Sequence, residues 1–441
     1  MGYLKRNLFE LLLVLYAASL AVGKTLWLPL LIMSICGLYL IFTHVRGRIL
    51  RKDGDLRLLI VALSVGLPSL ISIVNTEDLE RTVKFLVTFP LFVAVGFFAF
   101  YRARQGLNLR LLATGLGVIY LIWFGAVVWQ FVDPGSPFGK SDGGRYHGFF
   151  ANHLGGDLKM PVIAVGFGFF IAGILWDFRL RLLGAFVISS VVVLVILSGT
   201  RMVWLSLVWV SLLGVCVSLI VWRAHALKFV LAALLLASVL GGSIFIVIKD
   251  TPLMSRVNQS LIIFENPSYQ TINRALSNRL PMWETTLDMG TENPVFGTGA
   301  NAWRYAYPKY VPEDRSGHLV VVDGSSGREL GGYLFPHQHV LEVFSATGFS
   351  GLLGLFVFYS MLGAAIFASI KQKHWVAVGV AFALFSYFFP LNTHHSFYSS
   401  WITAWFWLWF GMLLGFLDYS AFVEKKSSSD GPFSEFRGDD D

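Results

Sequence analysis

The chain has 441 residues, of which 55% are hydrophobic and 14% are charged. A soluble globular chain carries about 25% charged residues, so the composition excludes a soluble protein and indicates an integral membrane protein. The net charge of +7 is spread over short loops without a basic stripe, which excludes a nucleic-acid partner. The apolar runs continue for roughly 18–22 residues, which favours helices over the alternating strands of a membrane β-barrel.

These runs predict an all-α polytopic membrane protein with about 12 transmembrane helices. The predicted spans are residues 8–22, 26–43, 56–74, 83–101, 111–132, 157–176, 180–198, 202–222, 227–248, 338–369, 373–391 and 397–418. The first span resembles a signal peptide, but Ser19-Leu20-Ala21 is a poor cleavage site and the next apolar run follows almost at once. We therefore interpret it as an uncleaved span.

The distribution of lysine and arginine predicts the orientation. With the N-terminus inside, almost every inner loop is rich in cations, whereas the short outer connections hold few of them. Both termini are then cytoplasmic, and the polar, acidic residues 421–441 form a disordered cytoplasmic tail.

Two outer segments stand out by their length. A loop covers about residues 133–156 after the fifth span, and residues 249–336 form a partly helical loop domain between spans 9 and 10. The predicted organisation is therefore helices 1–9 within residues 1–248, the loop domain at 249–336 and helices 10–12 within 337–420. A loop this long beside a compact membrane protein is usually functional.

Two arginines of the outer segments are candidates for binding an anion. Arg201 follows Ser198-Gly199-Thr200 at the N-terminus of a predicted helix, where its charge and the helix dipole act together. Arg279 precedes Pro281, which suits a helix start, and its guanidinium could bind a phosphate bidentately. The alternatives are a snorkelling Arg201 and an ion pair of Arg279 with Glu284 or Asp288.

His337 is a candidate general base because its ordinary pKa lets it accept a proton near neutral pH. Pro336 predicts that a helix begins here, with His337, Leu341, Phe344, Gly348 and Gly351 on one face and the two glycines packed against another helix. Spacing alone favours the alternative of a histidine that only caps the helix.

The histidine pairs argue against a metal site. His337 and His339 diverge on a helix, and the adjacent His394 and His395 cannot easily chelate one ion. We therefore expect neither a metal nor another cofactor. The aromatic run Trp401–Trp409 is interpreted as a lipid-facing belt that also packs against other helices, rather than a sugar platform.

Four stretches together resemble the O-antigen ligase/polymerase superfamily of bacterial envelope glycosyltransferases. They match the family's motifs in order, and the match covers about residues 140–355. The stretches are Gly148–Gly155, Leu197–Arg201, Arg279 with Trp283 and Asn293–Gly299, and His337–Gly351. Gln338 stands where the family often has asparagine, so we assign this position no role.

Size and layout are most similar to those of the O-antigen ligases. The resemblance implies an inverting, metal-independent transfer of a glycan from undecaprenyl diphosphate to the lipid A–core oligosaccharide, on the periplasmic face of the bacterial inner membrane. It implies that Arg201 and Arg279 stabilise the diphosphate and that His337 is the base or orients the acceptor. The expected substrate-binding residues are Arg145, Asn152, Trp283 and Arg304. Membrane lipids surround the protein.

Three alternatives stay open at this point. A glycan polymerase or a protein O-oligosaccharyltransferase would use the same donor chemistry with another acceptor. A flippase or transporter for lipid-linked sugars would place cations and polar groups inside the spans. In this sequence the candidate residues lie at the outer edge instead, which argues against a transporter.

Overall fold

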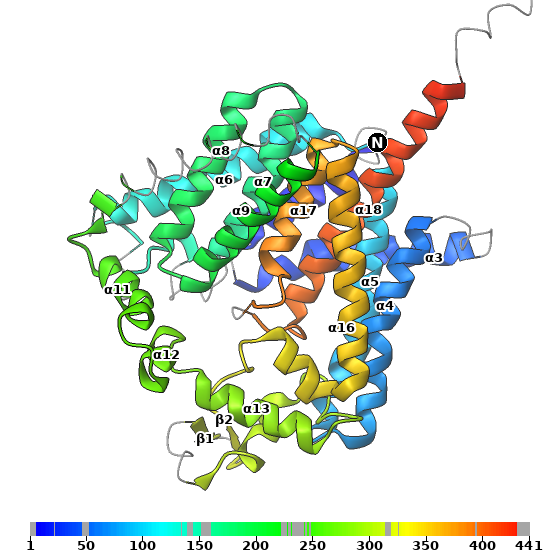
Figure 1. Ribbon diagram of the computed structural model, residues 1–441. Coiled ribbons are helices and arrows are strands. Elements are labelled where there is room, and N and C mark those ends of the chain that lie inside the picture. The colour runs from blue at the N-terminus through cyan, green and yellow to red at the C-terminus, as the bar shows by residue number, and fades with distance from the viewer. Residues whose placement is uncertain are drawn as a thin grey trace, which may run out of the picture.

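The computed structural model describes residues 6–429 apart from 22, 46–52, 134, 139–143, 151–159, 314–318, 325, 393–394 and most of 222–247. Within these residues, a bundle of apolar helices carries a segment of shorter elements at one end (Figure 1). We call this end of the bundle the loop end. Five of the described helices are long and apolar enough to cross a membrane, and six shorter apolar helices accompany them. The predicted helical membrane fold is confirmed in this coarse form.

Every predicted span except 227–248 coincides with a helix. Residues 227–248 lie mostly outside the described part of the chain, so the predicted number of spans stays untested. The helices are α2 (Leu8–Ser19), α3 (Trp27–Val45), α4 (Asp53–Ile71), α5 (Leu79–Arg104), α6 (Leu109–Val132), α7 (Met160–Asp177), α8 (Arg181–Leu197), α9 (Arg201–Val221), α16 (His339–Lys371), α17 (Trp375–Tyr387) and α18 (Ser400–Ser429). Short 3₁₀ turns are η1 (Gly23–Leu26), η3 (Ser72–Asn75) and η4 (Gly148–Phe150).

Helix α18 lies in the interior, packed along α5. Trp405, Trp407 and Trp409 are each at most 1% exposed, so the predicted lipid-facing belt is wrong, although its packing role is correct. A Cβ added to Gly411 would collide with the carbonyl of Gly96. The two backbones therefore touch where both residues are glycine, and the tryptophan rings fill the remaining space between the helices.

The loop end carries residues 252–336. Its elements are α11 (Pro252–Glu265), α12 (Tyr269–Ala275), α13 (Leu280–Glu292), α14 (Trp303–Ala306), η7 (Tyr307–Lys309), β1 (Val320–Val322) and β2 (Glu329–Gly331). The two strands pair antiparallel, with Val321 opposite Leu330, so the fold has one small sheet that the all-α prediction lacked. We call α11 and α12 the arm, and residues 280–336 the anchored half.

The anchored half has its own apolar core and is fixed to the connection between α4 and α5. The buried core residues are Met282, Met289, Trp303, Ala306, Tyr307 and Leu319. The Asn75 amide donates to Asn293 Oδ1 at 2.7 Å, and the Ala300 N–H donates to Ser72 Oγ at 3.0 Å. These bonds join residues more than 200 positions apart, so they place the anchored half on the bundle.

Helix α16 is interrupted at Gly348, whose backbone is non-helical at φ +63° and ψ −156°. The interruption frees backbone groups that bond the loop before α14: the Thr298 N–H donates to the Ser345 carbonyl at 2.8 Å, and the Phe349 N–H donates to the Pro294 carbonyl at 2.7 Å. A Cβ on Gly348 would lie 2.5 Å from the Pro294 oxygen. The sequence predicted that a helix packs on this glycine, and the prediction is wrong because a loop occupies the place.

Candidate functional site

The turn between α8 and α9 presents Arg201. Gly199 has φ +60°, a conformation that suits glycine, and α9 begins at Arg201 itself, as predicted. The guanidinium donates to the carbonyl of Ala275 at 3.0 Å and, at 3.4 Å, to that of Arg274. These carbonyls end α12, so Arg201 binds the arm rather than snorkelling away from the bundle.

The loop before α7 places Arg145 against the same turn. The Tyr146 N–H donates to the Leu197 carbonyl at 3.0 Å, and a Cβ on Gly199 would meet the Arg145 side chain at 3.2 Å. Gln130 of α6 holds this loop by accepting the N–H groups of His147 and Gly148, at 2.7 and 2.9 Å. Gln130 lies inside a predicted span, and no motif around it indicated this role.

Arg279 lies at the start of α13 and completes a group of three arginines. The pKa of its guanidinium is lowered to about 10, chiefly by burial and also by the positive charges of Arg201 and Arg145, while the Tyr333 hydroxyl raises it. Among the described residues, neither Arg145 nor Arg201 forms an ion pair with a carboxylate. Three cations held close together attract an anion strongly, because an anion relieves their mutual repulsion.

His337 does not lie on α16, which corrects the predicted helix start. The helix begins at His339, and Gln338 is its N-cap, with its side-chain oxygen accepting the Leu341 N–H. His337 precedes the cap with φ +55°, a left-handed conformation that is uncommon for residues other than glycine. His337 therefore belongs to the segment that precedes the helix, residues 333–338, which we call the strap. Its imidazole is not part of the predicted face of α16.

The strap is held from both sides. The Trp283 indole N–H donates to the Pro336 carbonyl at 2.8 Å, and the Gln338 amide donates to the Pro390 carbonyl at 3.2 Å. The rings of Phe335 and Tyr333 lie 4.2 and 6.1 Å from the His337 ring, measured between centroids. Trp283 follows Arg279 by one turn of α13, so the same helix start positions the arginine and the strap that carries His337.

His339 and Glu342 lie inside α16 and serve packing. His339 is 1% exposed, and its Nε2 lies 3.0 Å from the carbonyl oxygen of His395. The Glu342 carboxylate accepts the Ser396 hydroxyl and, at 2.7 Å, the Phe397 N–H. Both residues thus fix the connection between α17 and α18 to the start of α16, and the sequence did not predict the role of Glu342.

The structure does not bring all the predicted site residues together. It gathers Arg145, Arg201, Arg279, Trp283 and His337 at the loop end. Arg304 lies in the anchored half, where its Nε donates to the Gly331 carbonyl at 3.0 Å and supports β2. Asn152 lies outside the described residues. Tyr333, which the sequence did not single out, interacts electrostatically with Arg279 and has its ring near the His337 ring.

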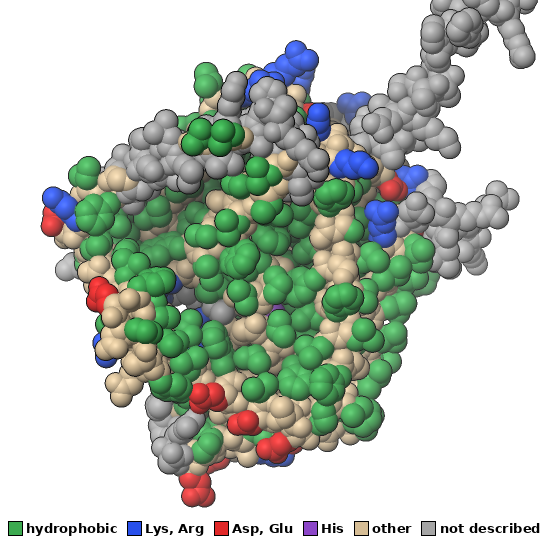
Figure 2. Space-filling view, viewed as in Figure 1, with side chains coloured by type: hydrophobic (Ala, Val, Ile, Leu, Met, Phe, Trp, Pro, Cys, Tyr) green, Lys and Arg blue, Asp and Glu red, His purple; other side chains and the backbone are tan. Residues whose placement is uncertain are grey.

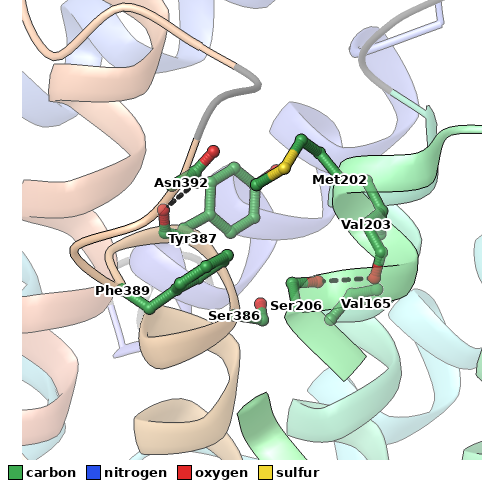
Figure 3. Close-up of a pocket in the computed structure, with 8 residues that line it drawn as sticks. All are labelled: Val165, Met202, Val203, Ser206, Ser386, Tyr387, Phe389 and Asn392. Carbon is green, nitrogen blue, oxygen red and sulfur yellow. Dashed lines mark hydrogen bonds between the residues drawn. The ribbon is translucent and has the colours of Figure 1, made fainter. Parts of the chain in front are cut away.

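Figure 2 shows that the face between the arm and the bundle is hollowed, with apolar walls and Lys or Arg side chains visible at depth. A separate small pocket, with about 250 Å³ of empty space, lies between α7, α9 and α17. Figure 3 shows Met202 and Ser206 on one side of it and Tyr387 and Phe389 on the other. No charged residue lines this pocket, so the anion site is the arginine group and not the pocket.

Residues 185–356 match the protein-family model described as O-Antigen ligase. The matched segment extends from α8 into α16 and includes Arg201, Arg279 and His337. The fold and this match together define a helical membrane protein that carries a domain of the O-antigen ligase family, within residues 185–356. No curated protein matches the chain.

Among the described residues, no group of three or more His, Cys, Asp and Glu side chains is arranged to hold a metal ion. The three arginines provide positive charge at the place where the sequence led us to expect a diphosphate. Metal independence itself stays a prediction, which a chelator can test.

Proposed function

We propose that the chain is an O-antigen ligase that transfers a glycan from undecaprenyl diphosphate to a sugar of the lipid A–core oligosaccharide. The reaction proceeds at the periplasmic face of the inner membrane, inverts the anomeric carbon and needs no metal. One observation carries the proposal: Arg145, Arg201 and Arg279 meet beside the strap that presents His337. The family match over these residues supports it.

The arginine group serves the leaving group. When the bond between the anomeric carbon and the diphosphate oxygen breaks, its electron pair stays on the lipid diphosphate, which gains negative charge. Arg279, which is largely desolvated, and its neighbours Arg145 and Arg201 stabilise this charge without reorganisation. Loss of one such contact costs about 3 kcal/mol, or roughly a hundredfold or more in rate.

His337 serves the acceptor. Its imidazole takes the proton of the attacking hydroxyl while that oxygen bonds the anomeric carbon from the side opposite the diphosphate. The positive backbone φ and the bonds of Trp283 and Gln338 set the direction of the ring. The aromatic rings of Phe335 and Trp283 are proposed to pack against sugar rings, and Arg304 and Asn152 are proposed to bind the glycan.

The test is transfer by the purified protein in lipid nanodiscs, given undecaprenyl-diphosphate glycan and lipid A–core in the presence of EDTA. The expected product is lipid A–core carrying the glycan, seen as a ladder on a gel. Elongation of the donor glycan alone would identify a polymerase instead. Loss of the product with EDTA, and its return with Mg²⁺, would contradict metal independence.

Arg279→Ala tests the role of the arginine group in the same assay. We expect at least a hundredfold loss of turnover, whereas the matched control Arg274→Ala, an exposed arginine on the arm, stays near the parent rate. Near-parent turnover in Arg279→Ala would remove the diphosphate role. Size-exclusion profiles of the two variants establish that both are folded.

A further inference from the structure

Helix α11 has an apolar stripe whose second half is left exposed by the part of the chain that the structure describes. Leu253, Val257, Leu261 and Phe264 are spaced four, four and three residues apart, so they share one face of the helix. Leu253 is the only buried residue of α11, whereas Leu261 is 48% exposed and Phe264 is 83% exposed. Exposed apolar residues of this size on one face indicate a surface that contacts something apolar.

Both ends of the arm are tied to the loop end of the bundle. At its start, Leu253 packs against the turn before α9, where a Cβ on Gly199 would lie 3.3 Å from the leucine side chain. At its end, Arg201 at the start of α9 binds the carbonyls of Arg274 and Ala275. Both ends of the arm therefore lie beside the turn between α8 and α9. These contacts keep the arm close to the loop end of the bundle.

Exposed apolar residues precede α11 in the chain. Phe245 and Ile246 are 51% and 68% exposed, and Val208 on the neighbouring α9 is 53% exposed. The Thr251 N–H and hydroxyl both donate to the Ile248 carbonyl, which makes a compact turn just before Pro252. The apolar outer surface of the bundle thus ends at the exposed ion pair of Lys249 and Asp250, as is usual at a membrane–water boundary, and α11 begins two residues later.

The direction of the stripe identifies its occupant. Leu253 points to the end of the bundle, and Phe264 points to nearly the same side because it lies three helical turns further on. Eleven residues of helix span about 16 Å, so Phe264 lies beyond the turn between α8 and α9 that covers Leu253. Beside a membrane bundle at this level, the apolar phase is the adjoining lipid leaflet.

We propose that α11 is an interfacial helix, with Leu261 and Phe264 inserted among the acyl chains of the membrane leaflet at the loop end. The polar face, with Ser255 and Gln259, points away from the membrane. This proposal concerns the membrane contact of the arm and does not depend on the reaction at the arginine group. It makes the arm a membrane-bound border of the hollow, past which a lipid substrate would enter.

The experiment places a fluorescent probe on each face of α11. In a full-length background with Cys36→Ala and Cys216→Ser, Phe264→Cys and Gln259→Cys are each labelled with bimane and placed in nanodiscs that contain lipids with doxyl-labelled acyl chains. We expect the probe at residue 264 to be quenched at least twofold more strongly than the probe at residue 259. Leu261→Cys provides a second position on the stripe if the Phe264 variant misfolds.

Equal, weak quenching at residues 259, 261 and 264 would overturn the proposal. Quenching at residue 264 that appears only when undecaprenyl diphosphate is added would also overturn it, because the occupant would then be the substrate. Loss of the difference together with crosslinking of Phe264→Cys between two copies would assign the stripe to a second copy of the chain and overturn it as well.

Discussion

The arm and the anchored half belong to one segment of the chain but are held in different ways. The anchored half contains a buried core that includes Met282, Trp303 and Tyr307, and it bonds the connection between α4 and α5. The arm has a single buried residue in α11 and none in α12. Both parts form helices, so contact with the bundle, rather than helix formation, distinguishes them.

The difference separates two tasks at the loop end. Arg279 and His337 lie at the two ends of the anchored half, where bonds from the bundle and from Trp283 fix their backbone. Arg201 belongs to the bundle but donates to the last carbonyls of the arm. The groups proposed for chemistry are thus held on the part with a buried core, and the part next to them is held mainly at its two ends.

The largest effect is expected at His337. His337→Ala removes the proposed base and should lower turnover by two orders of magnitude or more, with the unfolding temperature unchanged. The matched control His339→Ala removes a buried ring that binds the His395 carbonyl, so it should lower the unfolding temperature while the folded protein keeps most of its turnover. Near-parent turnover in His337→Ala would remove it as the base.

Gly348→Ala tests whether the anchored half depends on the interruption of α16. The φ and ψ of Gly348 are nearly restricted to glycine, at a cost of order 1–3 kcal/mol for another residue, and the added methyl would meet the Pro294 oxygen at 2.5 Å. We expect a clear fall in the unfolding temperature and faster proteolysis of residues 280–336. Gly363→Ala on the same helix, where a Cβ meets nothing within 4 Å, is the control. Equal stability of the two variants would show that the docking is weak.

Inorganic pyrophosphate should stabilise the protein by binding the arginine group. At a hundred times its dissociation constant, the ligand adds about 2.7 kcal/mol, which a thermal shift in nanodiscs measures. The gain should weaken as the pH rises through about 10, because Arg279 is a cation below its folded pKa of about 10 and neutral above it. Arg279→Gln should lose the gain, whereas Arg81→Gln should keep it. A gain that is the same in both variants would place the anion elsewhere.

The smallest expected effect comes from the outer ion pair of the anchored half. Arg328 bonds Asp78 at 2.8 Å and lies over the Tyr305 ring at 4.8 Å. Because the arginine is 43% exposed, solvent screens the pair, and a double-mutant cycle with Arg328→Met and Asp78→Asn should give a coupling of about 1 kcal/mol or less. A coupling of zero would leave the bonds of Asn75 and Ala300 as the anchor.

The sequence was sufficient to predict most helices and the position of Arg201. Continuous apolar runs predict helices directly, and the Ser198–Thr200 turn predicted that α9 begins at Arg201, as it does. It was insufficient for the backbone at His337, because Pro336 favours a helix start by local rules, whereas the bond from Trp283 to Pro336 and the bond from Gln338 to Pro390 join distant parts of the chain.

The remaining errors have the same origin. A run of tryptophans has the same sequence whether its rings face lipid or the protein interior. The rings of α18 face the interior because this helix packs along α5. Gly348 was correctly expected to permit a close approach, but the approaching group is the loop at Pro294. Anchoring bonds such as Asn75 to Asn293 join positions 218 residues apart, a separation at which a single sequence carries no pairing signal.

The interruption of α16 has a consequence for the synthesis of the protein. Ribosomes make the chain from its N-terminus, so the corner at Ser72–Asn75 exists long before the loop at Asn293–Gly299 emerges. Helix α16 emerges after this loop. The loop can dock on the corner first, but its bonds to Ser345 and Phe349 must wait until α16 has entered the membrane. His337 is therefore locked in place only after α16 has inserted and the Pro390 carbonyl beyond α17 has accepted the Gln338 amide, and a chain stalled before this step carries the arginines without a fixed histidine.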